Sequence, residues 1–437
     1  MMKVSVVGMG YVGVPLAAVV ASTGARVVGI DIDSERVAAI NRGRNPLRGR
    51  EPGLASLLQR QVRAGRLTAS ARHETCAQSD VVVLCVETPV DGRTHRPNLQ
   101  SLTSALASVG PHLKRGCLVS IESTLAPGTM AQVVRPTLER TSKRKAERDF
   151  FLVHCPERVT AGKLLHNLTT LDRILGTASP TGLRKARAFY RRFVRGAIHP
   201  TDWTTAELVK TAENAYWDVQ IAFANEIARL SEDVGVDSYE ARRLLNTSPF
   251  RSMLLPGAGV GGPCVPKDPW LLAASGRAYR PRLIPAARAI NDSMPRRMAG
   301  LIEDALEGVG RPLRGARVAV LGFAYRENTE DARNTPAKPL VRALRRRGAD
   351  VVIHDPLASS ERGYPVQRDL TVAITGADCL AIVTAHDAYG RLDLRAIGRR
   401  MRRKALVDGR NLFRGREAVE AGFVYRGIGK GQYLRPE

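Results

Sequence analysis

A glycine- and proline-rich segment, GVGGPCVPKDP at residues 259–269, places a cysteine close to an aspartate. Free cysteine is most often a small buried hydrophobic residue. The glycines around Cys264 argue against that interpretation, because they do not fill a core and they let a ligand approach the backbone closely. A neighbouring ammonium group, for which Lys210 is the candidate, favours the thiolate form of a cysteine. The pattern therefore favours a reactive Cys264 in a ligand site, with Asp268 near it.

Three other polar residues have types and spacing that suit chemistry. Lys210 and Asn214 are four residues apart and project from one face of an expected helix. Glu157 follows an expected strand in HCPERV, where a carboxylate either caps the loop or acts as a general base in a cofactor cleft. A solvated lysine is the ordinary outcome at a helix position such as that of Lys210. From the residues alone, both interpretations of Glu157 and Lys210 stay open.

The first 31 residues form a strand, a glycine turn, a helix and a second strand. Gly8, Gly10 and Gly13 form G-x-G-x-x-G, in which the glycines allow a tight turn, the approach of a pyrophosphate, and close helix–strand packing. Asp31 ends the second strand, where an acid accepts the ribose hydroxyls and favours NAD over NADP. The segment predicts a dinucleotide site, with the phosphates at the helix N-terminus.

Two α/β units are indicated along the chain. SDVVVLCVETP and GCLVSIEST continue the first unit as buried parallel strands that we expect to end at Thr88 and Thr124. A second unit opens near residue 311, where GADVVIHD repeats the pattern of GARVVGID without a G-x-G-x-x-G turn. A nucleotide bound there would be held by side chains. The predicted fold is α/β, with two Rossmann-like doubly wound parallel-sheet domains joined by a long central helix.

The central helix is expected to begin at an N-cap threonine, Thr204 or Thr205, and to end at Gly235. It would be about 30 residues or about 45 Å long. Because it is apolar around much of its girth, it should be buried between domains or across a dimer interface. We predict an NAD-binding domain at 1–200, a central helical domain with the cysteine loop at 201–300, and a C-terminal Rossmann-like domain at 311–437 in which a second nucleotide could bind.

Composition limits the class of protein. The chain of 437 residues carries a formal net charge of +25, which would suit a nucleic-acid binder, a membrane surface or a polyanionic substrate, although solvated helix faces explain it as well. Six scattered cysteines without metal-ligand spacing fit a reducing cytoplasm. The N-terminus has no signal-peptide pattern, and no apolar run reaches the roughly 18 residues of a membrane span. We expect a soluble cytoplasmic protein without membrane insertion or nucleic acid.

Taken together, the motifs resemble the UDP-glucose/GDP-mannose dehydrogenase family, the nucleotide-sugar 6-dehydrogenases. The resemblance covers almost the whole chain, in the family's order, and its most specific part is the cysteine loop. The motifs that carry it are VVGMGYVG, ESTLAPGT, CPERV, ELVKTAENAY, GVGGPCVPKDP, GFAYRENTEDARNTP and VDGRNLF.

The resemblance implies oxidation of a sugar C6 alcohol to a carboxylate with two NAD and no metal, in a homodimer formed through the central helix. Cys264 would be the nucleophile that forms a thiohemiacetal and then a thioester. Lys210 would stabilise the oxyanion, with Asn214 beside it. Asp268 would assist proton transfer. The residues implied at the hydrolytic water are Glu157 and Thr124.

The binding residues implied by the resemblance fall into two groups. Those for the cofactor are Gly8, Gly10, Tyr11, Val12, Gly13, Asp31, Arg36, Thr88, Pro89, Thr124 and Arg333. Those for the substrate are Glu157, Arg158, Val159, Lys210, Asn214, Arg251, Gly261, Tyr325, Arg326 and Arg410. Arg326 replaces a lysine of the family, Arg251 matches an arginine that reaches the partner subunit's substrate, and Arg333 matches one at the cofactor phosphates.

The identity of the sugar depends on a second set of residues. CPERV followed by LDRILG resembles the enzymes of UDP-N-acetylhexosamines, mannosamine in particular, which supply surface polysaccharide precursors. Ala161 stands where UDP-glucose enzymes often carry a glutamate, and Pro263 where N-acetylmannosamine enzymes often carry a histidine. UDP-GlcNAc and UDP-glucose are alternative substrates. A two-electron hydroxyacid dehydrogenase would have no use for Cys264, and a basic nucleic-acid-binding Rossmann protein would need binding motifs that the chain does not show.

Overall fold

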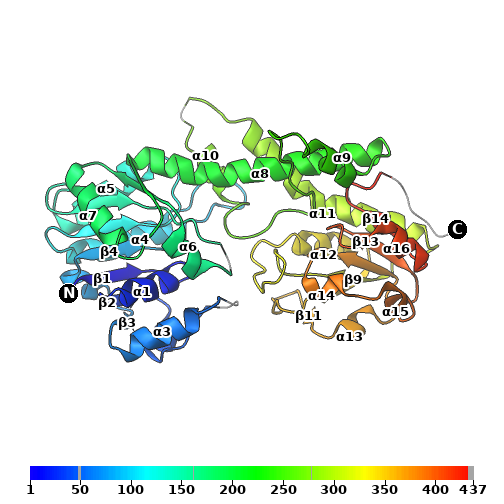
Figure 1. Cartoon of the computed structure of the whole chain (residues 1–437), viewed down its shortest axis with the longest axis horizontal. Helices are drawn as coiled ribbons and strands as arrows, with labels where there is room; N and C mark the ends of the chain where they lie inside the picture. Colours follow the sequence, from blue (N-terminus) through cyan, green and yellow to red (C-terminus); the bar gives the residue numbers. More distant parts are fainter. Residues whose placement is uncertain (48–50, 161, 277, 432–437) are drawn as a thin grey trace. The chain divides into compact units, whose positions relative to one another are not determined.

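The computed structural model describes residues 1–47, 51–160, 162–276 and 278–431 (Figure 1). Ala161, which bears on the sugar, lies outside the described residues. The chain forms two compact units: Met1–Glu213 with Trp270–Arg280, and Asn214–Pro269 with Pro281–Glu437. The predicted domain boundaries near residues 200 and 300 separate segments with different expected functions, and they stay a prediction.

The first unit is built on an eight-stranded sheet in the order β3-β2-β1-β4-β5-β6-β7-β8. Its strands are β1 (Lys3–Val7), β2 (Arg26–Ile30), β3 (Leu67–Ser70), β4 (Val81–Leu84), β5 (Leu118–Ile121), β6 (Phe151–His154), β7 (Arg173–Thr177) and β8 (Ile198–Thr201). The strands are parallel from β3 to β6, and β7 runs antiparallel to β6. The strand order reverses direction at β1, which has β2 on one side and β4 on the other. This reversal is the topological switch point of a doubly wound sheet.

Helices cover both faces of this sheet. They are α1 (Gly13–Ser22), α2 (Ser34–Asn41), α3 (Leu54–Arg63), α4 (Gln100–Val109), α5 (Arg135–Ser142), α6 (Leu164–Thr170) and α7 (Pro180–Tyr190). Alternate residues of β1 enter two different cores, Val4 and Val6 on one face and Val7 on the other. The strands therefore read as continuous apolar runs, as a sheet buried on both faces requires.

The second unit has a six-stranded, fully parallel sheet in the order β11-β10-β9-β12-β13-β14. Its strands are β9 (Arg317–Leu321), β10 (Asp350–His354), β11 (Val366–Gln367), β12 (Cys379–Ile382), β13 (Ala405–Asp408) and β14 (Val424–Gly427). Its helices include α9 (Ser238–Leu245), α11 (Leu283–Glu307), α12 (Ala337–Arg346), α13 (Leu370–Ile374), α14 (Asp387–Gly390), α15 (Leu394–Gly398) and α16 (Gly415–Glu420). The predicted fold class, with two doubly wound sheets, is confirmed.

The central helix α8 runs from Trp203 to Asp233, 31 residues. The prediction of a threonine N-cap was wrong: the Asp202 carboxylate precedes the helix and accepts from the Thr205 amide at 3.0 Å and from its hydroxyl at 2.5 Å. A carboxylate there also interacts favourably with the positive end of the helix. None of the helices in the described part of the chain is long and apolar enough to span a membrane.

Large apolar side chains along α8 are exposed. They are Leu208, Tyr216, Phe223 and Leu230, with 47, 66, 50 and 55% of their surface accessible. The last three are spaced seven residues apart, so they lie along one side of the helix. Burial of the helix between domains or across a dimer interface stays a prediction.

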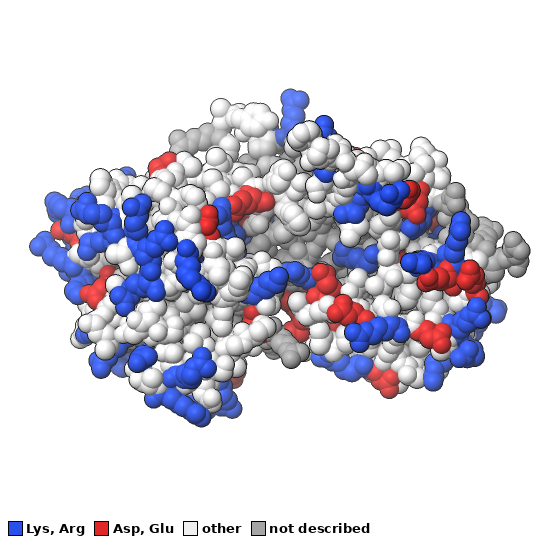
Figure 2. All heavy atoms as spheres, viewed as in Figure 1, with Lys and Arg blue, Asp and Glu red and all other residues white. Residues whose placement is uncertain are grey.

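Basic side chains outnumber acidic ones on the face shown in Figure 2. A long stretch without acidic residues lies between Asp172 and Asp202 and contains α7. The buried side of α7 carries Ala186, Phe189 and Tyr190, which pack on the sheet. The exposed cations of α7 are Arg184, Lys185 and Arg187, and Arg191, Arg192 and Arg195 follow the helix. This arrangement is that of a solvated helix face.

Candidate active site

The glycine turn after β1 has the geometry that a dinucleotide needs. Gly8 has a φ of +88°, and a Cβ there would lie 2.8 Å from the Cys85 carbonyl oxygen. A Cβ at Gly13 would collide with the Gly8 carbonyl, so this glycine lets α1 pack on the strand. A Cβ at Gly10 would meet no atom within 4 Å, which leaves space beside the backbone. The Gly10 position therefore suits the approach of a pyrophosphate.

Asp31 follows β2 as predicted, but its carboxylate already has protein partners. One oxygen accepts from the Met9 amide at 2.7 Å, and the Arg36 guanidinium lies 2.9 and 3.0 Å from the two oxygens. The other oxygen also accepts from the Asp33 amide. An adenosine ribose at this position would meet a carboxylate–guanidinium pair, not an isolated acid.

The remaining cofactor candidates lie in loops at the carboxyl edge of the sheet. The Tyr11 hydroxyl donates to Glu51 at 2.6 Å, and Glu51 also accepts from the Gly162 amide. Glu51 was missed in the sequence, where nothing marks a partner 40 residues from Tyr11. The Thr88 hydroxyl donates to the Thr124 carbonyl at 2.6 Å. The remaining cofactor candidates of this unit are Val12, half-buried, and Pro89.

The expectation that strands reach Thr88 and Thr124 was wrong. β4 ends at Leu84 and β5 at Ile121, so both threonines lie in the loops that follow. Glu207 on α8 accepts from the amides of Gly128 and Met130, both at 2.6 Å. Burial raises the pKa of Glu207 to about 7, against the lowering effect of these two amides. Glu207 thus ties the loop after β5, which carries Thr124, to α8.

Glu157 and Lys210 form a buried ion pair, with 3.6 Å between Oε1 and Nζ. The other Glu157 oxygen accepts from the Val159 amide at 2.7 Å. The solvated-lysine interpretation of Lys210 is wrong, because its side chain is only 7% exposed. Arg158 pairs with Glu213, a partner that the sequence did not indicate.

His154, at the end of β6, is a buried neighbour of this pair. Burial lowers its pKa to about 4, although the Ile121 carbonyl at 3.0 Å raises it; the charge of Lys210 lowers it further. His154 is therefore neutral near pH 7, with Nδ1–H donating to the carbonyl. It adds no charge to the surroundings of Glu157 and Lys210.

Asp268 is fully buried at the start of α10 (Asp268–Ala273), and both of its oxygens are occupied. The Asn214 amide donates to one oxygen at 2.5 Å, and the Lys267 ammonium lies 2.6 Å from the other. The structure thus brings together Asn214 and Asp268, two predicted catalytic residues, within the second unit. Both contacts orient the Asp268 carboxylate.

The Cys264 loop packs against the segment after β9. The Gly262 amide donates to the Arg333 carbonyl at 2.9 Å, and a Cβ at Gly261 would lie 2.5 Å from that of Tyr325. Gly262 has a φ of +94°. Gly261 and Gly262 are therefore needed for packing on Tyr325, and the approach of a ligand to this loop stays a prediction.

Arg333 is electrostatically coupled to the cysteine. Burial lowers its pKa, but hydrogen bonding to Asp331 and weaker charge interactions with Tyr325 and Cys264 outweigh this and raise it. Cys264 is half-buried, and its carbonyl accepts from the amides of Lys267 and Asp268. A guanidinium thus lies in the surroundings of the thiol within the same unit.

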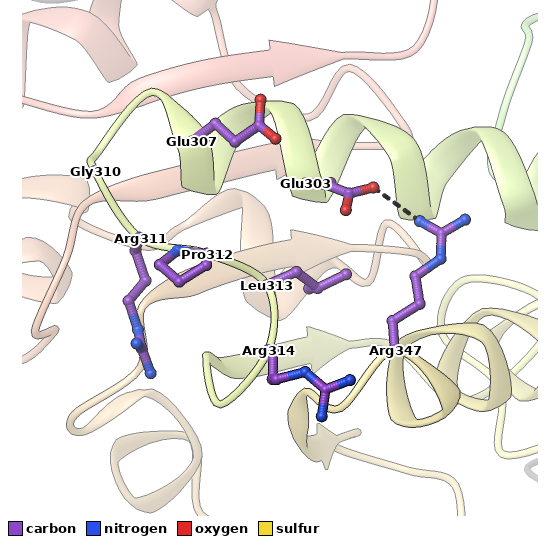
Figure 3. A pocket seen from close by; sticks show the side chains of 8 residues that line it. All are labelled: Glu303, Glu307, Gly310, Arg311, Pro312, Leu313, Arg314 and Arg347. Atoms are coloured by element: carbon purple, nitrogen blue, oxygen red, sulfur yellow. Dashed lines mark hydrogen bonds and ion pairs between the residues drawn. The ribbon is translucent and has the colours of Figure 1, made fainter.

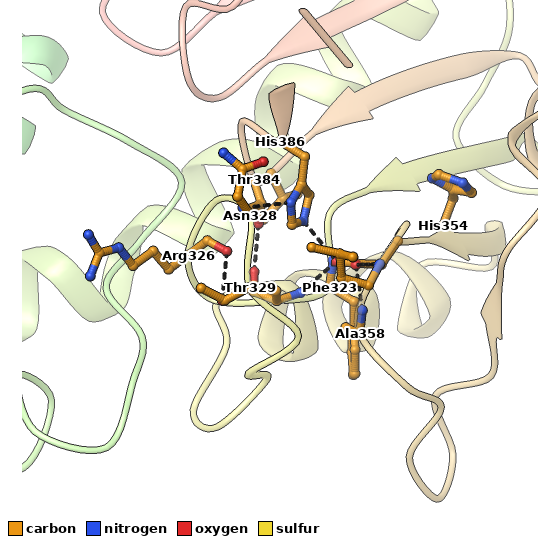
Figure 4. A network of polar contacts seen from close by, with 12 residues as sticks. Phe323, Arg326, Asn328, Thr329, His354, Ala358, Thr384 and His386 are labelled. Atoms are coloured by element: carbon orange, nitrogen blue, oxygen red, sulfur yellow. Dashed lines mark hydrogen bonds and ion pairs between the residues drawn. The ribbon is translucent and has the colours of Figure 1, made fainter. Parts of the chain in front are cut away.

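The other predicted arginines differ in their environments. Arg410 follows β13, and its Nε donates to the Val383 carbonyl at 2.8 Å; burial lowers its pKa. A Cβ at Gly257 would collide with its guanidinium. Arg326 is 41% exposed and extends away from the polar network in Figure 4. Arg251 is exposed and donates to the Phe250 carbonyl.

A surface hollow in the second unit lies away from these residues (Figure 3). It is lined by Glu303, Glu307, Arg311, Leu313, Arg314 and Arg347, and Arg347 pairs with Glu303 at 3.0 Å. The hollow is at the amino end of β9, whereas ligands of doubly wound sheets bind at the carboxyl ends. It is therefore not part of the candidate active site.

A glycine turn that admits a pyrophosphate in one doubly wound unit, and a cysteine loop in a second, define a dinucleotide-dependent oxidoreductase. The chain belongs to the UDP-glucose/GDP-mannose dehydrogenase family. The family's NAD binding domain matches residues 2–194, its central domain 204–293 and its UDP binding domain 319–415. The protein is an NAD-dependent nucleotide-sugar dehydrogenase, and the predicted cofactor and enzyme class are confirmed.

Named relatives agree over the full length. The UDP-N-acetyl-D-mannosamine dehydrogenase of Pyrococcus horikoshii is 40% identical, covering 98% of this chain and 100% of the relative. The solved structure of the UDP-D-ManNAc dehydrogenase from that organism has a TM-score of 0.91 at 39% identity, with the same coverage. The structure of an NDP-N-acetyl-D-galactosaminuronic acid dehydrogenase from Methanosarcina mazei has a TM-score of 0.87 at 34% identity, covering 99% of this chain and 96% of that one.

Proposed function

We propose that the protein oxidises C6 of UDP-N-acetylmannosamine to a carboxylate, giving UDP-N-acetylmannosaminuronate for a surface polysaccharide. The names of the full-length relatives and the CPERV and LDRILG signatures support this sugar. The observation that carries the proposal is the Cys264 loop, which is held by Tyr325 and Arg333 and followed by the buried Asp268. A two-electron dehydrogenase has no need of such a loop.

The reaction removes four electrons in two hydride transfers. NAD, when bound, supplies the hydride acceptor for each transfer. In the first transfer, the C6 carbon loses a hydride and its hydroxyl loses a proton, with the help of Asp268, which gives an aldehyde. The Cys264 thiolate then forms a C–S bond to C6, and loss of a second hydride from this thiohemiacetal leaves a thioester. Water adds to the thioester, the C–S bond breaks, and a carboxylate and the thiol are released.

The neighbouring side chains have roles that follow from their surroundings. Lys210, a buried ammonium, stabilises the oxyanion at C6. Asn214 orients Asp268, which assists proton transfer. Glu157 and Thr124 position the hydrolytic water, and the Lys210 ammonium lies 3.6 Å from the Glu157 carboxylate.

Binding is divided between the two units in this proposal. The turn at Gly10 and the pair of Asp31 and Arg36 hold NAD on the first unit. On the second unit the UDP-sugar residues are Tyr325, Arg326 and Arg410, with Arg333 at the cofactor phosphates. The family's UDP binding domain, matched at residues 319–415, supports this division.

We also propose a homodimer formed along α8. Its exposed Tyr216, Phe223 and Leu230 form an apolar row that a second copy of the helix would bury. Arg251, which is exposed in the single chain, would then act on the partner's sugar nucleotide.

The substrate is tested by a panel of UDP-sugars. UDP-N-acetylmannosamine should give the highest kcat/KM, above UDP-GlcNAc and UDP-glucose, with two NADH formed per sugar. Initial rates of NADH formation, together with end-point stoichiometry, measure both quantities. A higher kcat/KM for UDP-glucose would overturn the sugar assignment alone, and one NADH per sugar would favour the two-electron reaction.

The preference for NAD is expected to be about 100-fold over NADP in kcat/KM, because the buried Asp31 carboxylate repels a 2′-phosphate. Arg36 keeps the preference from being larger. Initial rates with each cofactor measure it. In an Asp31→Ala variant, Arg36 would face the phosphate alone, and the preference should nearly vanish. Equal or better turnover of the wild type with NADP would contradict this prediction.

A further inference from the structure

The second unit has an aspartate at the position equivalent to Asp31, but this carboxylate is hydrogen-bonded to the unit's own backbone. Asp355 follows β10 as Asp31 follows β2, each after the second strand of its unit. One Asp355 oxygen accepts from the amides of Phe323 and Ala324 at 2.7 and 2.8 Å. The other accepts from the amides of Leu357 and Ala358. In a dinucleotide site, a carboxylate at this position accepts from the ribose hydroxyls. Here the acceptor positions of Asp355 are occupied by backbone amides of its own chain.

His386 completes this network and lies almost fully buried beside Asp355 (Figure 4). Its Nε2 is 3.1 Å from the Asp355 carboxylate, and its Nδ1 is 2.9 Å from the Asn328 backbone nitrogen. Because an amide can only donate, Nδ1 accepts and Nε2–H donates to Asp355. His386 therefore joins the sheet to the segment after β9 as a neutral imidazole.

The segment that His386 holds, residues 322–335, carries the proposed sugar-nucleotide residues. We name it the β9 loop. Asn328 has a φ of +56°, and its side chain accepts from the Asp387 amide at 3.1 Å. The Thr384 hydroxyl donates to the Ala324 carbonyl at 2.6 Å. Two neighbouring residues after β12 thus hold both the start and the middle of this loop.

The β9 loop also supports the cysteine loop. Beyond Asn328 it reaches Arg333, whose carbonyl accepts from the Gly262 amide, and Asn334, whose side chain donates to the Gly262 carbonyl at 3.1 Å. Gly262 is two residues from Cys264. A shift of the β9 loop would therefore change the positions of Tyr325 and Arg326 and loosen the cysteine loop.

We propose that His386 is a positioning residue for the sugar nucleotide, which fixes the β9 loop through Asn328 before UDP binds. The inference rests on the proposed function for the roles of Tyr325 and Arg326. Asn328 is exposed, so its amide can bind water if His386 releases it. Loss of the contact would then leave the unit folded but the loop mobile, and UDP would have to order it on binding.

Two substitutions test the two hydrogen bonds of His386 separately, the one to Asp355 and the one from the Asn328 amide. In His386→Gln the amide nitrogen lies near the Nε2 position and still donates to Asp355, but the acceptor for Asn328 is lost. In His386→Asn the carbonyl lies near the Nδ1 position and keeps that acceptor. We expect His386→Gln to weaken UDP binding about 5-fold, as the loss of one hydrogen bond implies, and His386→Asn to stay within about 2-fold of the wild type.

Titration calorimetry with UDP measures these affinities on the full chain without turnover. His354→Gln is the matched control: this buried histidine bonds to Tyr389 and the Arg368 carbonyl, so UDP affinity should not change. In turnover with UDP-N-acetylmannosamine, His386→Gln should raise KM by the same factor while kcat stays within about 2-fold. Thr384→Val, which frees the start of the loop, should weaken UDP binding as well and serves if His386→Gln does not fold.

Three results would overturn the inference: unchanged UDP affinity in His386→Gln or Thr384→Val, an equal loss in His386→Asn, or an equal loss in His354→Gln. Failure of the proposed function has a different signature. A wild type that forms no NADH with any UDP-sugar would refute that function, whereas the order of UDP affinities among the variants would still decide the role of His386.

Discussion

The Cys264→Ala variant is expected to lose acid formation by at least about 10³-fold while still binding NAD. The substitution removes the thiolate that retains the aldehyde, and the loss of a nucleophile typically has an effect of this size. The turn of Gly8, Gly10 and Gly13 lies in the other unit and is unchanged. Product analysis under single turnover measures the acid, and fluorescence titration measures NAD affinity.

The control for this variant is Cys379→Ala, which removes a thiol that is fully buried in β12. It should cost stability but leave acid formation per folded molecule unchanged. In the wild type, an aldehyde-trapping reagent should capture nothing and two NADH should form per sugar. A Cys264→Ala enzyme that makes acid at a near-normal rate would refute covalent catalysis.

The Lys210→Ala variant is expected to lower kcat/KM by about 10²–10³-fold, or about 3–4 kcal/mol, because it removes a buried cation that stabilises the oxyanion. It also leaves the Glu157 carboxylate buried without its partner 3.6 Å away, so stability should fall too. The double variant Lys210→Ala with Glu157→Gln removes that charge and should recover stability but not activity. Thermal unfolding and initial rates separate the two effects.

Arg229→Ala, an exposed change on the same helix, is the control for Lys210 and should leave both quantities unchanged. Lys210→Arg should restore little activity, because a planar guanidinium does not reproduce the position of a compact ammonium. Activity recovered in the double variant would mean that Lys210 acts only by neutralising Glu157.

The architecture was predictable because its signals are local. The glycine turn, the buried strands and the repeat of GARVVGID in GADVVIHD each depend on residues within about 30 positions. The ends of elements were less predictable. β4 and β5 end before Thr88 and Thr124, because strand ends depend on pairing with neighbours, and the helix cap fell on Asp202, which a sequence pattern does not separate from the threonines after it.

The partners of the site residues could not be predicted. Glu51 bonds to Tyr11 across 40 residues, and Glu207 to Met130 across 77. Such pairs depend on how distant loops meet, and neither residue type nor spacing signals them. The packing of Gly261 and Gly262 on Tyr325 could not be predicted either, because Tyr325 lies more than 60 residues away in the sequence. The resemblance to a family indicates which residues belong to the site, and the structure shows which partners they contact.

The continuous helix α8 fixes the angle, around its axis, between the side chains of two proposed catalytic residues. Lys210 belongs to the first compact unit and Asn214 to the second, with the division falling inside an unbroken helix. Each residue of an α-helix adds about 100° of rotation and about 1.5 Å of rise. One residue inserted between them would turn the ammonium about 100° away from the face that carries the Asn214–Asp268 contact. The angle between the Lys210 and Asn214 side chains around the helix axis therefore depends on the number of residues between them.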